Sequence, residues 1–195
     1  MSPVVEEHAA DLQSEAIASF AFELGLLKRI RRSGWWQVGL RDPESVAEHS
    51  LRVAQLATII AAEEGADPAR AALLAVWHDS QETRTGDIPH TARPYLDKPV
   101  PAAITADQTQ SLPDTTSKTV RAIVDEYEEQ RTVEVRCAKD ADKLECLIQA
   151  VEYREAGYST VQGWIDSSRA ALTTDTAARI ADAALTTSPL AWRGR

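Results

Sequence analysis

The sequence predicts an all-α fold. Helix-forming Ala and Leu are common, and the β-branched residues do not alternate with polar residues as strands require. Proline, glycine and capping residues divide the chain into segments of helical length. Its 195 residues are enough for one domain with a substantial core. We therefore expect a single domain over residues 1–195, built from about seven helices, with its core in residues 13–157 and C-terminal helices over residues 160–187.

The first three helices are expected over residues 13–30, 43–65 and 67–82. The first ends at Ser33-Gly34, and the second ends at Gly65, because glycine commonly follows the last helical turn. The third begins with Asp67 as N-cap and Pro68 at the first helical position, which is a strong start for a helix. A proline-rich loop then covers residues 86–102, and loops of this length in compact domains are often functional.

Further helices are expected in the second half of the chain, and they too are bounded by proline, glycine and capping residues. A short helix is expected over residues 102–110, and longer helices over residues 114–130 and 133–156, the last ending at Gly157. Residues 160–187 are expected to form two helices that break near Thr173-Thr174. Sequence patterns place such boundaries only to within about two to four residues.

Composition excludes several classes of function. The net charge of −9 disfavours non-specific binding to a nucleic acid polymer, which requires many Lys and Arg side chains against phosphates. No apolar run approaches the roughly 18 residues of a membrane span, and the N-terminus lacks a signal-peptide pattern, so we expect a cytoplasmic protein. Cys137 and Cys146 are too far apart for a CxxC site. One basic cluster, residues 28–32, could still bind a small anion.

Four residues are candidates for binding a metal ion: His49, the pair His78-Asp79, and Asp142. Each has apolar or small residues at helical spacing, which predicts that it points inward. Imidazole and carboxylate groups are costly to bury unless they are paired or bound to metal, and together they suit a borderline divalent cation. Each residue alone has a simpler interpretation, since an inward histidine is more often a hydrogen-bonded core residue and Asp142 could form a salt bridge.

The order of several motifs adds a resemblance to a known family. The stretches are LKRIRRSGW (27–35), PESVAEHSLRVA (43–54), ALLAVWHDSQETRTGDIP (72–89) and YEEQRTVEVRCAKDADKLECLIQAVEY (127–153). In this combination the chain resembles the HD-domain superfamily, and within it most closely the 5′-deoxynucleotidase branch. The resemblance implies a single all-α HD domain that hydrolyses deoxyribonucleoside 5′-monophosphates, and an assembly as a homodimer.

The resemblance also implies roles for individual residues. Four would be metal ligands: His49, His78, Asp79 and Asp142. They would hold one divalent ion, of which Co, Mn, Fe, Ni, Zn and Mg are all open. Glu82 matches the residue assigned to proton transfer, and Asp87 matches one that approaches the sugar. Arg32, with Arg31 as second choice, matches the region that meets the phosphate, beside Trp35. The sequence RRSGWW departs from members that place Arg directly before Trp.

Other interpretations stay open at this point. Glu82 could be a solvated residue near a helix end, Asp87 a turn former, and Trp35 a core or dimer contact. The same metal centre could act on a different phosphate ester or a nucleoside triphosphate. A di-iron oxygenase is disfavoured by the shortage of histidines. A non-catalytic nucleotide-binding or scaffold protein is disfavoured by the complete set of expected ligands together with Glu82.

Overall fold

The computed structural model describes residues 3–97 and 100–194, and within these ranges the chain is helical with no β-strand. The α-helices, in chain order, are α1 (Pro3–Leu24), α2 (Val46–Glu63), α3 (Pro68–Trp77), α4 (Glu82–Thr85), α5 (Pro101–Gln108), α6 (Asp114–Glu129), α7 (Val133–Glu155), α8 (Gln162–Ala171) and α9 (Asp175–Thr186). Short 3₁₀ helices lie at η1 (Gly25–Lys28), η2 (Ser33–Val38), η3 (His90–Tyr95), η4 (Ser159–Val161) and η5 (Ala191–Gly194). The all-α prediction is confirmed.

Helix α3 is shorter than predicted, and this correction bears on the candidate metal ligands. The expected helix ran to Glu82, but α3 ends at Trp77 and a turn precedes α4. The turn is stabilised by its own side chains: the His78 ring nitrogen Nδ1 lies 2.6 Å from the Ala75 carbonyl oxygen, and the Ser80 hydroxyl donates to the Trp77 carbonyl at 2.9 Å. These bonds satisfy carbonyl groups that a continuing helix would otherwise use.

Other boundaries follow from caps that are visible in the sequence. Asp67 accepts from the backbone N–H groups of Ala69 and Arg70, as predicted for the N-cap of α3. Helix α2 begins three residues later than expected, because Ser45 and Glu48 form a capping box across its first turn. The break between α8 and α9 falls at the predicted Thr173-Thr174.

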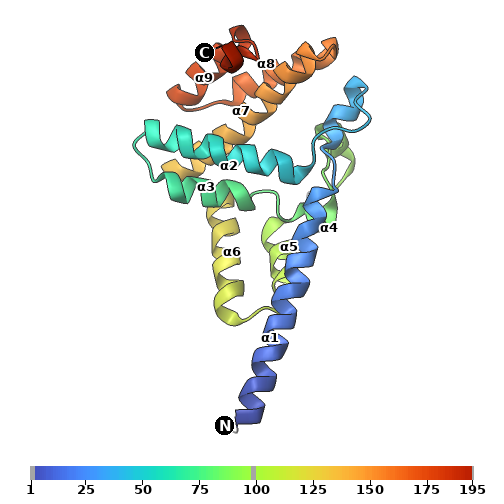
Figure 1. Ribbon diagram of the computed structural model, residues 1–195, viewed down its shortest axis with the longest axis vertical. Helices are drawn as coiled ribbons and strands as arrows, with labels where there is room; N and C mark the ends of the chain where they lie inside the picture. The colour runs from blue at the N-terminus through green and yellow to red at the C-terminus, as the bar shows by residue number, and fades with distance from the viewer. Residues whose placement is uncertain (1–2, 98–99, 195) are drawn as a thin grey trace.

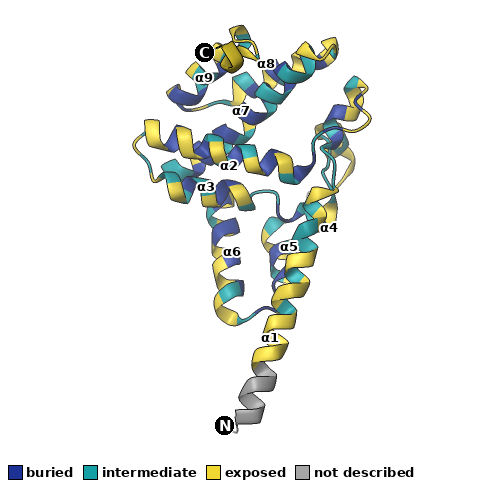
Figure 2. Ribbon diagram, in the orientation of Figure 1, coloured by how far each residue is buried: buried dark blue, intermediate teal, exposed yellow. Residues whose placement is uncertain are grey.

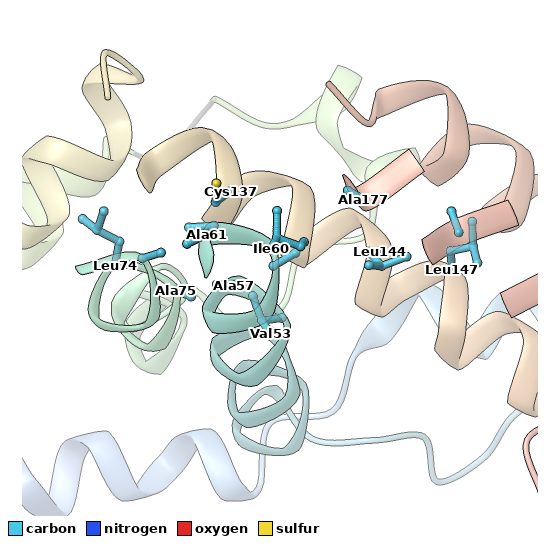
Figure 3. Close-up of a cluster of buried hydrophobic side chains, with 14 of the residues drawn as sticks. Val53, Ala57, Ile60, Ala61, Leu74, Ala75, Cys137, Leu144, Leu147 and Ala177 are labelled. Atoms are coloured by element: carbon cyan, nitrogen blue, oxygen red, sulfur yellow. The ribbon is translucent and has the colours of Figure 1, made fainter. Parts of the chain in front are cut away.

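The core lies where α2 and α3 pack against α7, with α8 and α9 covering the other side of α7 (Figure 1). Figure 3 shows Ala57, Ala61 and Ala75 between larger side chains such as Ile60 and Leu74. Small residues at helix contacts permit close approach of the backbones, since the distance between packed helices depends on the side chains between them. Side chains from α2, α3 and α7 are therefore brought within reach of one another.

Helix α1 is attached to the rest of the molecule at its C-terminal end. Phe20 stacks on Trp77 with ring centroids 6.3 Å apart, and Glu23 accepts from Arg84, Thr83 and Gln108. The earlier turns extend past the other helices (Figure 1), and residues 10–19 among them are largely exposed (Figure 2). Across the described residues, no helix combines the length and apolarity that crossing a bilayer requires.

The connection between α8 and α9 is tied to α7 by one buried carboxylate. Asp140 accepts from the backbone N–H and hydroxyl groups of both Thr173 and Thr174, at 2.6 to 3.1 Å. Hydrogen bonds to a charged group are stronger than those between neutral groups, and a buried donor left without its acceptor is costly. Asp140 therefore fixes the start of α9 against α7.

We predict that Asp140→Ala lowers the free energy of unfolding by about 2–4 kcal/mol, because it leaves the backbone N–H groups of Thr173 and of the buried Thr174 without their acceptor. The measurement is urea unfolding followed by circular dichroism. The matched control is Asp166→Ala on the exposed face of α8, which should change stability by less than about 0.5 kcal/mol. Equal midpoints for the two variants would contradict this role for Asp140.

Candidate metal centre

The four predicted ligands come from three elements that meet in the core. His49 lies in the first turn and a half of α2, His78 and Asp79 lie in the turn that follows α3, and Asp142 lies in the middle of α7. His78 and Asp79 lie just past the end of α3, in a turn where the His78 N–H donates to the Ala75 carbonyl at 3.4 Å and the Ser80 N–H to the Trp77 carbonyl at 3.2 Å.

The ligand atoms converge on one point. His78 Nε2 lies 3.0 Å from Asp79 Oδ2, and His49 Nε2 lies 3.8 Å from the same oxygen. Asp142 Oδ1 lies 3.3 Å from His49 Nε2. His49, His78 and Asp79 offer three ligand atoms that are all within 4.8 Å of one another, an arrangement that could hold a metal ion, and Asp142 borders it from α7.

Both imidazoles are hydrogen-bonded in a way that leaves Nε2 free to bind a metal. His78 Nδ1 faces the Ala75 carbonyl oxygen, which can only accept, so this nitrogen carries the proton. His49 Nδ1 lies 2.5 Å from a carboxylate oxygen of Glu145, another acceptor. Metal-binding histidines characteristically donate their second nitrogen to a carbonyl or carboxylate, which fixes the tautomer and the ring orientation.

Four buried polar atoms in this region have no hydrogen-bond partner: His49 Nε2, His78 Nε2, Asp79 Oδ2 and Glu82 Oε2. Unpaired buried polar groups are rare in folded proteins because each one costs free energy. These four belong to the same cluster, and a divalent cation would satisfy the first three. The residues present therefore fit a metal with nitrogen and oxygen ligands.

The electrostatics of the cluster favour a positive charge at its centre. Burial and the nearby Arg32 both oppose protonation of His49, yet the adjacent carboxylates of Asp142 and Glu145 outweigh them and raise its pKa to about 10. Burial also opposes ionisation of Asp79, but the neighbouring His78 and Arg32 hold the pKa of Asp79 well below its usual range. Asp79 therefore carries a negative charge at the point where the ligand atoms meet.

Glu82 differs from the other acids of the cluster. Burial, followed by repulsion from Asp79 and Asp87, raises the pKa of Glu82 to about 9. Its backbone N–H donates to the Asp79 carbonyl at 3.1 Å, so Glu82 begins α4 directly beside the ligand turn. A carboxyl group whose pKa is raised in this way can hold a proton at neutral pH, as general acids in active sites do.

Arg32 and Asp87 border the cluster as a pair. Arg32 Nη1 lies 3.1 Å from Asp87 Oδ1 and 3.5 Å from Asp79 Oδ2. Ser33 donates to Asp87 Oδ2 through its backbone N–H and its hydroxyl, each at 2.6 Å. The segment that follows η1 is in this way connected to the loop at residues 86–89. Of the two arginines expected at the phosphate, the structure brings Arg32 to the cluster.

The other arginine lies elsewhere. Arg31 pairs with Asp42 at 2.8 Å and Glu48 at 3.7 Å, and with them lines a polar cavity of about 440 Å³. The cavity also borders Glu145 and Arg52, so it lies on the Nδ1 side of His49. Arg31 is therefore separated from the converging ligand atoms by the His49 ring and its partners.

The structure places Trp35, the expected substrate contact, in the core. Trp35 is 2% exposed, stacks on Trp164 with centroids 5.5 Å apart, and meets Tyr153 edge to face. Its ring N–H donates to Glu44 Oε1 at 3.1 Å. The alternative interpretation, core packing, describes this side chain, and the exposed neighbour is Trp36.

Two residues at the cluster were missed in the sequence. Lys143 donates to Asp142 Oδ2 at 2.7 Å and is partly exposed at the edge of the cluster. Glu145 is fully buried against His49. Their place in KDADKLE gave a usable pattern, because Glu145 follows Asp142 at i+3 and shares its side of the helix.

The family model for the HD domain matches residues 24–183, which is most of the chain. The chain belongs to the HD-domain family. This match covers all four candidate ligands together with Arg32, Glu82 and Asp87. It confirms the resemblance that the motifs indicated.

Curated relatives carry a more specific name. The chain is 33% identical over 144 residues to the 5′-deoxynucleotidase HDDC2 of Xenopus laevis, a match that covers 72% of this chain and 71% of the relative. The human protein of the same name is also 33% identical, over 73% of this chain and 70% of the relative. The 5′-deoxynucleotidase hdd1 of Schizosaccharomyces pombe is 31% identical, with 72% and 74% covered.

Solved structures agree with the fold. A conserved hypothetical protein from Pyrococcus furiosus superposes with a TM-score of 0.69 at 28% identity, covering 87% of this chain and 99% of that chain. A predicted metal-dependent phosphohydrolase from Magnetospirillum magnetotacticum MS-1 gives a TM-score of 0.65 at 23% identity, covering 90% and 94%. The second likeness supports the fold alone.

Proposed function

We propose that this HD-domain protein is a metal-dependent phosphomonoesterase that hydrolyses deoxyribonucleoside 5′-monophosphates to deoxynucleoside and phosphate. The observation that carries the proposal is the convergence of His49 Nε2, His78 Nε2 and Asp79 Oδ2, buried and without hydrogen-bond partners. Asp142 is proposed as the fourth ligand from its 3.3 Å approach to His49. The names of the curated relatives support the choice of substrate.

In the proposed reaction, a bound cation and side chains of the protein have separate roles. A bound divalent ion, whose identity among Co, Mn, Fe, Ni, Zn and Mg is open, would activate water and neutralise charge on the phosphoryl group. Arg32 would bind phosphate oxygens, because its guanidinium has five donors and the contacts to Asp79 and Asp87 engage one nitrogen. Glu82 would transfer the proton, since its raised pKa favours the protonated form at neutral pH.

Asp87 is proposed to face the sugar of the nucleotide. Its carboxylate is already oriented by Arg32 and by two donors of Ser33, so it would be held in place before the substrate arrives. A fixed acceptor that recognises a sugar hydroxyl can discriminate strongly between substrates with and without that group. The same contacts position Arg32 beside the proposed phosphate site.

The test is phosphate release from a panel of substrates by the purified protein. We expect release from deoxyribonucleoside 5′-monophosphates, loss of that activity with EDTA, and recovery on adding Co²⁺ or Mn²⁺. Preferential release from ribonucleotides, triphosphates or another phosphate ester would replace the proposed substrate. Absence of release from every compound, with metal bound, would favour the non-catalytic alternative.

We predict that Glu82→Ala separates the chemical step from metal binding. Glu82 lies beside the ligand turn, so its loss should slow single-turnover hydrolysis by about 10²–10⁴-fold while metal content stays unchanged. Arg32→Met should instead raise the KM, because Arg32 would bind the ground-state phosphate as well.

The matched control is Glu63→Ala, which removes an exposed glutamate from α2 far from the cluster. Its rate and metal content should equal those of the wild type. A wild-type rate for Glu82→Ala would remove Glu82 from the mechanism, and loss of metal would make it a ligand.

We also propose a homodimer. Exposed apolar side chains on α1 support it, with Phe22 at 81% exposure and Leu12 and Ile17 on the same helix, together with the exposed Trp36. Large exposed apolar side chains that gather on one element commonly mark an interface. Light scattering should give about twice the 21.3 kDa chain mass, and Phe22→Glu should lower that mass. A monomer mass for the wild type at every concentration would contradict the proposal.

A further inference from the structure

A chain of polar contacts, buried at its inner end, runs outward from the candidate metal centre along the contact between α2 and α7. It begins at His49 Nδ1, which lies 2.5 Å from Glu145 Oε2. The other oxygen, Glu145 Oε1, accepts from Arg52 twice, through Nε at 3.0 Å and Nη2 at 2.8 Å. Both His49 and Glu145 are fully buried, so the contact between them is shielded from solvent.

Arg52 is itself held on its outer side. Its Nη1 lies 2.9 Å from both oxygens of Glu152, and its Nη2 donates to Gln149 at 2.7 Å. All of these residues follow helical spacing: His49 and Arg52 are three apart on α2, and Glu145, Gln149 and Glu152 lie along one side of α7. The planar fork of arginine suits such fixed, two-sided contacts.

Stability alone does not account for this arrangement. Removing two charges from water costs several kcal/mol per ion, and well-packed apolar pairs are often at least as stabilising. The contacts do have a consequence for the metal site, because the two oxygens of Glu145 bind different partners. Arg52 occupies Oε1, and Oε2 must therefore accept the proton of His49 Nδ1.

We propose that Glu145, clamped by Arg52, is a positioning residue of the metal centre. It keeps the proton of His49 on Nδ1 and orients the ring, so that the lone pair of Nε2 faces His78 and Asp79. The inference rests on the proposed metal site and adds two residues that do not touch the ion. Outer contacts of this kind typically change metal affinity by about 10–100-fold when they are lost.

The substitution Glu145→Gln tests the proton assignment without changing side-chain size. Arg52 offers only donors, so the amide oxygen of the glutamine would take the Oε1 position. Its NH₂ group would then face His49 Nδ1 and require that nitrogen to be unprotonated. The proton would move to Nε2 and block metal binding. We expect Co²⁺ affinity, measured by competition titration, to fall by about 100-fold.

In the double variant Glu145→Gln with Arg52→Met, we expect Co²⁺ affinity to recover, whereas two substitutions that only disturb packing would lower it further. Without Arg52 the amide can turn over and present its oxygen to His49 Nδ1, which restores the required tautomer. Co²⁺ affinity should therefore recover by about 10-fold relative to Glu145→Gln alone, with the absorption spectrum of bound Co²⁺ returning toward that of the wild type. A residue that acts only in packing would show a double variant at least as weak as the single one.

Glu155→Gln is the matched control, since it changes an exposed glutamate of α7 outside this chain of contacts and should alter Co²⁺ affinity by less than about 3-fold. Wild-type affinity in Glu145→Gln, or no recovery in the double variant, would overturn the positioning role. Failure of the wild type to bind Co²⁺ would instead remove the proposed metal site itself. If Glu145→Gln does not fold, Arg52→Met alone decides: weaker binding supports the clamp, and unchanged affinity overturns it.

Discussion

The interior of this protein has to accommodate charge that is removed from water at the contact of α2, α3 and α7. His49 Nε2, His78 Nε2 and Asp79 Oδ2 are buried, face one another and lack hydrogen-bond partners. Burying such groups costs much free energy unless a cation binds between them or cationic side chains neutralise the acids. Three cations stand around the cluster: Arg32, Arg52 and Lys143. Arg32 pairs with Asp87 and lies 3.5 Å from Asp79, Lys143 pairs with Asp142, and Arg52 pairs with Glu145.

The fold brings the helices that carry these residues close enough together for the side chains to meet. Alanines on α2, α3 and α7 allow the helices to approach, and the ligands extend from positions one or two turns away from these contacts. The turn that follows α3 at Trp77 is equally important, because it carries both His78 and Asp79. The bond from His78 Nδ1 to the Ala75 carbonyl both ends the helix and fixes the ring, so local structure and site geometry have one cause.

The sequence predicted the all-α class and most helix boundaries, because caps such as Asp67 act through neighbouring backbone atoms. It also identified the residues that converge at the cluster, since their spacing matched a known pattern. It failed where distant packing decides the outcome. Trp35 is a core residue because Tyr153 and Trp164 enclose it, and both lie over a hundred residues along the chain. The role of Glu145 depends on a contact between two helices that spacing on either helix alone does not reveal.

The central claim is that three elements build one metal centre whose histidines bind through Nε2. Crystals soaked in Co²⁺ and measured at the cobalt absorption edge test it most directly, because anomalous scattering locates the ion independently of the protein atoms. The account predicts one peak at about 2.0–2.2 Å from His49 Nε2, His78 Nε2 and Asp79 Oδ2, with Asp142 completing the set from α7. A fully occupied cobalt peak elsewhere in the molecule, with these atoms unligated, would contradict it.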